Sequence, residues 1–253
     1  MRLAFLVLVL AACVTEPAGR RDAGAREAAS PPVTLTPLSE GVWLHSSYRV
    51  IEPYGPIVTN GLLVASEDGA WLIDTAWTDE QTREVLRLAQ AAGHPVAHAV
   101  FTHAHDDKMG GVAALKAAGI ETHAHPLSNA LAPKRGLEAA HADLAVAADG
   151  TSTLQTGRPR SLEIFYPGPA HTMDNIVVYV PTARVLFGGC IVRPGDAADL
   201  GNTADADVGR WATSTQAVAS RFLDARIVVP SHGTPGTRAL LDHTIALAKG
   251  ASS

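Results

Sequence analysis

Cysteine is scarce in this chain, and several common functional signatures are absent from it. The 253 residues include only two cysteines, Cys13 and Cys190, which excludes a disulfide framework. No basic block occurs and the formal net charge is −5 at pH 7, so no nucleic acid partner is expected. Neither a glycine-rich phosphate loop nor a short-period repeat is present. With 47% hydrophobic and 18% charged residues, the composition is that of a globular protein with a sizeable core.

A long apolar run is also missing, and a short one lies at the N-terminus. Arg2 precedes the apolar residues 3–10, and Ala11, Ala12 and Cys13 follow. The run is shorter than the ~20 residues that span a bilayer, so it predicts a signal peptide. Small residues before a cysteine are also typical of a lipobox, in which Cys13 is acylated and becomes the mature N-terminus. The alternative is an ordinary signal peptide that is cut at the two alanines.

The lipobox interpretation divides the chain into three parts. Residues 1–13 would be a lipoprotein-type signal peptide, and residues 33–253 the folded domain. Residues 14–32 are rich in Ala, Pro, Gly and charge without an apolar period, which predicts a flexible tether. No aspartate follows Cys13 to signal retention in the inner membrane. We therefore expect a periplasmic domain that is lipid-anchored to the outer membrane.

Hydrophobic patterns predict strands and helices in both halves of the folded domain. Strands are expected at residues 41–50, on both sides of a turn at 68–69, and at 94–102, 161–168, 174–181, 184–190 and 225–232. Helices are expected at residues 79–92 after a capping box that begins at Thr78, at 111–118, at 205–223 and at the C-terminus. Strands and helices in each half predict two packed sheets with helices outside, an α/β (α+β) fold of the αββα sandwich type.

The tetrapeptide Thr-His-Ala-His occurs twice, at residues 102–105 and 122–125. In the first copy, a two-residue spacing along an extended segment would place His103 and His105 on one side, where both reach one metal ion. Asp107 extends the set. The second copy has no acid within reach, and it reads as two little-buried histidines on an edge strand. We therefore expect metal at the first copy, against the alternative of two core histidines satisfied by hydrogen bonds.

Three more residues whose side chains can bind a metal each follow a predicted strand: His171, Cys190 and His232. Loops at strand ends are where a rigid scaffold gathers site residues. A catalytic zinc takes three protein ligands and leaves one position open, so six ligands fit two ions. A thiolate together with imidazoles favours zinc over magnesium or calcium.

Seven strings follow one another in order from about Leu38 onward: "NGLLV", "LIDTAW", "THAHDDKMGG", "FYPGPAHTMDN", "FGGC", "LGNTADAD" and "SHGTP". In these strings the chain resembles the subclass B1 metallo-β-lactamases, and within them the New Delhi type most. The resemblance implies a first zinc ion held by His103, His105 and His171, and a second held by Asp107, Cys190 and His232.

The resemblance also assigns roles around the two ions. Asp74 matches a carboxylate that orients the ligands, and Asn202 matches a residue that polarises the lactam carbonyl. Arg193 stands where the family usually has lysine, and either cation can grip the substrate carboxylate. Trp77 and residues 48–57 would flank the groove.

The implied activity is hydrolysis of the β-lactam amide bond. Penicillins, cephalosporins and carbapenems would be attacked by a zinc-bound hydroxide that Asp107 orients, and the outcome would be antibiotic resistance. No Ser-x-x-Lys string supplies a serine nucleophile instead. A monomer is expected.

Two other functions remain open. Thioester hydrolases of the glyoxalase II kind share the fold, but they usually show H-x-H-x-D-H, whereas Lys108 follows Asp107 here. Cys190 would have no use in that scheme. A non-catalytic periplasmic zinc-binding lipoprotein is the second alternative, although a structural zinc site usually closes with four ligands.

Overall fold

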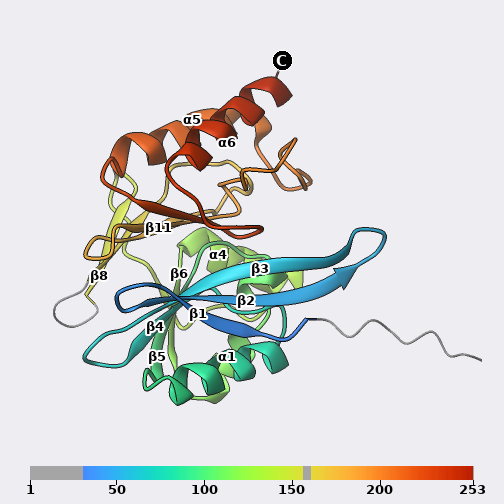
Figure 1. Ribbon diagram of the computed structural model, residues 1–253. Helices are drawn as coiled ribbons and strands as arrows, with labels where there is room; N and C mark the ends of the chain where they lie inside the picture. The colour runs from blue at the N-terminus through green and yellow to red at the C-terminus, as the bar shows by residue number, and fades with distance from the viewer. Residues whose placement is uncertain (1–30, 156–160, 253) are drawn as a thin grey trace, which may run out of the picture.

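Two mixed β-sheets face each other in the computed structural model, which describes residues 31–155 and 161–252 (Figure 1). The signal peptide, Cys13 and most of the predicted tether lie outside the described residues. Helix α1 covers the outer side of one sheet, and α5 and α6 cover the outer side of the other. This arrangement confirms the predicted αββα sandwich. No helix in the described part is both long enough and apolar enough to cross a membrane.

The first half forms a seven-stranded sheet in the order β1 to β7. Its strands are β1 (Thr34–Ser39), β2 (Val42–Ile51), β3 (Gly55–Val64), β4 (Ala70–Ile73), β5 (Val96–Phe101), β6 (Glu121–Ala124) and β7 (Ala142–Asp143). Strands β1 to β4 pair antiparallel, and β4 to β7 pair parallel. The helices of this half are α1 (Asp79–Ala91), α2 (Asp106–Met109), α3 (Val112–Ala117), α4 (Pro126–Leu131) and the 3₁₀ helix η1 (Ala132–Arg135).

The second half forms a five-stranded sheet in the order β12-β11-β10-β9-β8. Its strands are β8 (Thr151–Gln155), β9 (Ser161–Phe165), β10 (Val177–Val180), β11 (Val185–Gly189) and β12 (Ile227–Pro230), and its helices are α5 (Val208–Arg221) and α6 (Ala239–Ala251). Strands β11 and β12 pair parallel, so their C-terminal ends meet at one edge of the sheet.

Strand β10 shows how the sequence builds the two apolar layers. All four of its residues are apolar and buried, as expected for a strand covered on both faces. Val177 and Tyr179 join the core beneath the helices α5 and α6, whereas Val178 and Val180 join the core between the sheets. The alternation of side chains along a strand therefore lets one short segment serve both cores.

The helix start predicted at Thr78 is confirmed, but only the Thr78 half of the capping box forms, because the Gln81 side chain donates to the carbonyl of Tyr48 at 2.7 Å instead. The Thr78 hydroxyl accepts a hydrogen bond from the backbone N–H of Gln81 at 3.2 Å, and Asp79 and Glu80 lie in the first turn, where acids favour the helix dipole. The helix ends at Ala91, close to the predicted end. Strands β1, β7 and β8 and the short helices α2 and α4 were not predicted from the sequence.

Candidate metal centre

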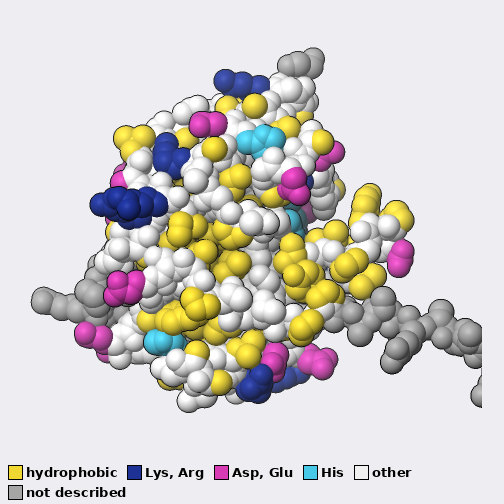
Figure 2. Space-filling model, in the orientation of Figure 1, with side chains coloured by type: hydrophobic (Ala, Val, Ile, Leu, Met, Phe, Trp, Pro, Cys, Tyr) yellow, Lys and Arg dark blue, Asp and Glu magenta, His cyan; other side chains and the backbone are white. Residues whose placement is uncertain are grey.

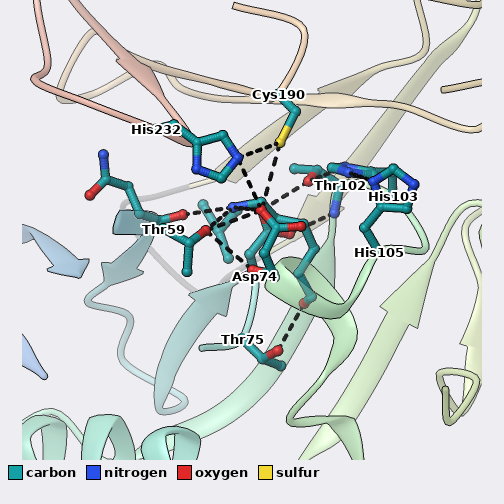
Figure 3. Close-up of polar contacts among 12 residues, drawn as sticks. Thr59, Asp74, Thr75, Thr102, His103, His105, Cys190 and His232 are labelled. Atoms are coloured by element: carbon teal, nitrogen blue, oxygen red, sulfur yellow. Dashed lines mark hydrogen bonds and ion pairs between the residues drawn. The ribbon is translucent and has the colours of Figure 1, made fainter. Parts of the chain in front are cut away.

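The candidate ligands gather where the parallel strands of both sheets end (Figure 3). His103 and His105 follow β5, and Cys190 directly follows β11. His232 follows β12, and His171 lies on the connection from β9 to β10. Side chains that are far apart in sequence meet here because both sheets present strand C-termini at the same end of the sandwich.

Three imidazole nitrogens converge on one point. Nε2 of His103 lies 3.1 Å from Nδ1 of His105, and Nε2 of His171 lies 3.3 Å from the same atom. Zinc–nitrogen bonds of 2.0–2.1 Å in tetrahedral geometry place two ligand nitrogens about 3.3 Å apart. The rings stand nearly perpendicular to one another, at 77° to 86°. Both separations from Nδ1 of His105 therefore match the separation of two ligands on one tetrahedral zinc ion.

The convergence does not arise from an extended segment, so that part of the sequence argument was wrong. The backbone N–H of His105 donates to the carbonyl of His103 at 3.0 Å, which makes a tight bend between them. Asp107 then lies inside helix α2 rather than on the same extended face. The bend turns the two rings toward each other, and the helix turn carries the carboxylate to the neighbouring cluster.

Burial keeps two imidazoles of this first cluster neutral, those of His103 and His171. His103 is fully buried, and burial with the proximity of His105 lowers its pKa well below the usual value. The same two causes lower the pKa of His171 to about 3. A neutral imidazole offers a free lone pair, which is the form that binds a metal.

Hydrogen bonds behind the rings aim the lone pairs inward. The Thr102 hydroxyl donates to Asp74 Oδ2 at 2.8 Å and lies 3.2 Å from Nδ1 of His103. Since that oxygen is already a donor to Asp74, it accepts from His103 Nδ1–H and leaves Nε2 free. Nε2 of His105 lies 2.8 Å from a carboxylate oxygen of Asp205, which leaves Nδ1 free. Such outer partners commonly fix the orientation of metal-binding histidines.

The second cluster has the dimensions of a mixed sulfur, nitrogen and oxygen site. Cys190 Sγ lies 3.7 Å from Asp107 Oδ2 and 3.5 Å from His232 Nε2, and the latter two atoms are 3.5 Å apart. A tetrahedral zinc with a 2.3 Å bond to sulfur predicts ligand separations of about 3.3–3.6 Å. Nδ1 of His232 donates to the carbonyl of Val58 at 2.6 Å, so Nε2 faces the cluster as an acceptor.

Cys190 is a free, buried thiol. Burial, together with the nearby Asp107 carboxylate, raises the pKa of this thiol well above its usual range. The metal-free protein therefore holds a neutral thiol, and zinc binding has to release its proton.

Lys108 lies beneath both clusters, fully buried. Its Nζ donates to the Thr59 hydroxyl at 2.6 Å and lies 3.2 Å from Asp107 Oδ2 and 3.7 Å from Asp74 Oδ2. Burial alone would lower the pKa of Lys108, but Asp107 and Asp74 outweigh it and raise the pKa. Burial alone would likewise raise the pKa of Asp107, but Lys108 and His232 hold it well below its usual range. Lys108 thus keeps the Asp107 carboxylate ionised.

Two functional side chains, Lys108 and Asp205, were missed by sequence reasoning. Lys108 had been noted only as a departure from another motif. Asp205 accepts from His105 and also pairs with Arg135 at 3.0 Å. In the sequence, Asp205 is marked only as one of two acidic residues in the string "LGNTADAD". Acidic residues are too common on protein surfaces for this to identify it as a functional residue.

The donor set fits zinc. A thiol, four imidazoles and a carboxylate lie together. Asp107, Cys190 and His232 have ligand atoms within 4.8 Å of one another, and so do His103, His105 and Asp107, while His171 Nε2 lies 3.3 Å from His105 Nδ1. The clusters adjoin, because His103, His171 and Cys190 also lie within 4.8 Å of one another. Imidazole and thiolate are zinc ligands, whereas magnesium and calcium prefer oxygen.

The residues expected on the substrate side lie around the clusters. Trp77 is buried, with its ring centroid 6.3 Å from that of His232. Arg193 is partly exposed and donates from Nε to the carbonyl of Asp199 at 3.1 Å. Asn202 is exposed, and its side-chain oxygen accepts from the backbone N–H of Ala204 at 3.1 Å. Asn202 therefore caps its own loop.

The segment at residues 48–57 is a hairpin rather than a loop. Strands β2 and β3 pair from Ile51 and Gly55 inward, and the hairpin projects from the body of the molecule (Figure 1). Apolar side chains gather on the projecting end (Figure 2), and Val50 and Tyr54 are among the exposed apolar residues. The guanidinium of Arg49 lies 5.7 Å from the centroid of the Trp77 ring, so the hairpin reaches the site.

The second Thr-His-Ala-His copy differs from what its sequence predicts. His125 is 7% exposed, accepts from the backbone N–H of Leu127 at 3.1 Å and stacks on Tyr166. His123 lies 3.5 Å from the carboxylate of Glu121. Strand β6 is flanked by β5 and β7, so it is not an edge strand. The expectations of slight burial and of no acid within reach were wrong, because the acid precedes the copy and a short strand covers it.

The chain is similar in sequence to known proteins over most of its length. A family model described as the metallo-beta-lactamase superfamily matches residues 54–232. A metallo-beta-lactamase type 2 from Bacillus cereus is 37% identical over 218 residues, which cover 86% of this chain and 83% of that relative.

Solved structures are similar as well. The metallo-beta-lactamase FIM-1 from Pseudomonas aeruginosa in its mono-zinc form has 46% identity and a TM-score of 0.83, covering 88% of this chain and 97% of its own. A metallo-beta-lactamase from Erythrobacter litoralis has 46% identity and a TM-score of 0.82, covering 86% and 96%. By sequence and by structure, this chain belongs to the metallo-β-lactamase family, among homologues of the B1 kind.

Proposed function

We propose that this protein hydrolyses the amide bond of β-lactam antibiotics with two zinc ions. His103, His105 and His171 would hold one ion, and Asp107, Cys190 and His232 the other. The observation that carries the proposal is the pair of adjoining three-ligand clusters, each with the atom separations of a tetrahedral zinc site. The relatives named metallo-beta-lactamase type 2 support the reaction.

When bound, zinc supplies a nucleophile from water at neutral pH and polarises the carbonyl under attack. Asp107 contributes a carboxylate that stays ionised beside Lys108, so it can accept a hydrogen bond from the attacking water and orient it. The hydrogen bonds behind His103, His105 and His232 hold the ligand rings in place before substrate arrives.

Substrate contacts would come from the rim of the site. The Arg193 guanidinium is partly exposed and can pair with the carboxylate of a β-lactam through two parallel N–H donors. Trp77 offers an apolar wall beside His232. Asn202 would have to give up its contact with the Ala204 N–H to donate its amide to the lactam carbonyl. That hydrogen bond is exposed, so exchanging it costs little.

The proposals on enzyme type, substrate range and membrane anchoring rest on short strings in the sequence. Within the B1 group we propose the New Delhi type as the nearest in character, and penicillins, cephalosporins and carbapenems as substrates of a monomeric enzyme. The residues after Leu10 support acylation at Cys13, and hence a periplasmic enzyme on the outer membrane that confers resistance.

Hydrolysis of a chromogenic cephalosporin, with and without a chelator, tests the function. We expect turnover that is lost after dialysis against the chelator and restored by zinc. A glutathione thioester serves as the second substrate, because the fold also hosts thioester hydrolases. Zinc-dependent cleavage of the thioester without cleavage of the cephalosporin would overturn the proposal.

A further inference from the structure

A second group of metal-ligand side chains lies on strands β5 and β6, away from the metal centre. Its members are His98, Glu121 and His123. Glu121 and His123 are two residues apart on β6 and point to the same face, and His98 is the register partner of Glu121 on β5. The metal centre follows the C-terminal ends of its strands, whereas His98 and Glu121 lie toward the N-terminal ends of theirs.

The separations in this group match those of a metal site. His98 Nδ1 lies 3.4 Å from Glu121 Oε2, and His123 Nε2 lies 3.5 Å from Glu121 Oε1. One ligand atom from each residue lies within 4.8 Å of the other two. Tetrahedral zinc with bonds of 2.0–2.1 Å calls for separations of about 3.3 Å, so small side-chain movements would close the site.

Both imidazoles are held in position by Trp71. The rings of Trp71 and His98 stack with centroids 4.7 Å apart at 19°, and those of Trp71 and His123 with centroids 5.6 Å apart at 29°. Trp71 belongs to the core between the sheets and is 4% exposed. Rings fixed in this way lose little freedom when they bind a metal.

The contacts within the group are not accounted for by hydrogen bonding. Nδ1 of His98 is buried, and among the described residues it accepts or donates no hydrogen bond. Two imidazoles, one of them with a buried ring nitrogen, face a carboxylate here, and these are the donors that a divalent transition metal takes.

We propose that His98, Glu121 and His123 bind a divalent transition-metal ion of the zinc class, at a site distinct from the metal centre. The side chain of Glu121 is 57% exposed, which opens the site to solvent and leaves room for water as a further ligand. An ion here links β5 to β6 and stabilises the sheet by mass action. The site takes no part in hydrolysis.

Metal counting on the holoenzyme tests the site. Wild type, Glu121→Gln and His123→Gln are dialysed against buffered free zinc, and protein-bound zinc is measured. The wild type should hold one equivalent more than either variant. His94→Gln is the matched control, because the His94 ring also contacts a tryptophan, Trp43, with centroids 4.3 Å apart at 43°, but lies outside the group. It should hold as much zinc as the wild type. Equal zinc in wild type and Glu121→Gln overturns the proposal.

Thermal unfolding supplies a second measurement on the same proteins. Excess zinc, added after the metal centre is filled, should raise the Tm of the wild type and of His94→Gln but not that of Glu121→Gln. Glu121 is mostly exposed, so its replacement by the isosteric amide should leave the fold and the β-lactam turnover unchanged. The same rise of Tm in Glu121→Gln would contradict the site.

Discussion

The buried ammonium of Lys108 holds together two carboxylates that would otherwise repel each other. Asp74 and Asp107 both lie within 3.7 Å of its Nζ, and none of the three side chains is more than 6% exposed. Burial raises the pKa of Asp74 to about 7 even with Lys108 and two donors from Thr102 acting against it. Of the charges around the two carboxylates, that of Lys108 favours their ionisation most.

Replacing Lys108 with methionine should be strongly destabilising. The change leaves two buried acids without their counter-charge, and removing one partner of a buried ion pair typically costs about 3–5 kcal/mol. Urea unfolding of the variant measures the loss. The control is Lys116→Met, whose exposed pair with Glu138 should contribute less than about 1 kcal/mol. Equal losses in the two variants would mean that Lys108 is not a key counter-charge.

The two copies of the repeated tetrapeptide should respond differently to alanine. His105→Ala removes a proposed zinc ligand and should lower turnover by at least about 10–100-fold, since even outer partners of ligands cost that much. His125→Ala removes the side chain that caps α4 and stacks on Tyr166, so it should cost about 1–2 kcal/mol of stability. Its turnover should stay within a few-fold of the wild type. If His125→Ala lost most of its turnover and His105→Ala did not, the metal site would lie at the second copy of the tetrapeptide, and the proposal would be wrong.

Element by element, α2 shows where sequence reasoning reaches its limit. Alternation along residues 102–107 suggested an extended segment, and the ligand-type residues alone indicated a metal site near the end of β5, where the candidate ligands gather. The bend at His103 and His105 and the four-residue helix after it were not predictable. Both depend on tertiary contacts, such as the donation from the Ala104 N–H to Asp174, which is 70 residues away in sequence. Short strands such as β7 were missed for the same reason.

The β2–β3 hairpin is tied to the site by Arg49, which pairs with Asp106 and lies over Trp77. Its side chain is 50% exposed, so Arg49→Ala should change stability by less than about 1 kcal/mol. If the hairpin flanks the substrate groove, the variant should raise KM while kcat changes little. Arg87→Ala on α1 breaks an exposed pair with Glu84 and serves as the control. An unchanged KM in Arg49→Ala would show that this contact of the hairpin takes no part in substrate binding.

Across the whole molecule, the two halves are joined by hydrogen bonds beside the metal centre. The side-chain amide of Asn60 donates to the carbonyls of Pro230 and Gly233 at 3.0 and 2.8 Å, and His232 donates to that of Val58. These bonds span 170 to 174 residues of sequence. The motifs predict the sandwich and the types of ligand residue. The hydrogen bonds between the two halves were not predictable, because they form only when the two sheets are packed against each other.

Attachment to the membrane is a prediction about the full chain, and it rests on residues outside the folded domain. If Cys13 is acylated, the wild type should fractionate with outer membranes, and Cys13→Ala should be soluble or unprocessed. Stable anchoring takes more than one acyl chain, so fatty-acid labelling should follow the same pattern. Cys190→Ser controls for loss of a cysteine and should stay with the membranes. A wild type found wholly in the soluble periplasmic fraction would leave the ordinary signal peptide as the explanation.

Stability of the whole domain should fall as the pH drops below 6.5, and His45 supplies a measurable share. Burial, followed by the charge of Lys108, lowers the pKa of His45 from 6.5 to about 4, while the ring donates to the carbonyls of Ile73 and Asp74. In the unfolded chain His45 has the higher pKa, so it binds a proton there first as the pH falls. Its contribution to the free energy of unfolding is therefore fully present above pH 6.5 and is lost progressively as the pH falls through about 4. Between pH 7 and pH 5 the loss should be about 2 kcal/mol.

Urea unfolding of the zinc-free protein at several pH values measures that loss. His45→Gln keeps a donor at the position but cannot titrate, so its stability should fall less steeply than that of the wild type between pH 7 and pH 5. The buried ligand histidines titrate in both proteins and cancel in the difference. Parallel stability curves for the two proteins would show that His45 has the same pKa in the folded and unfolded states.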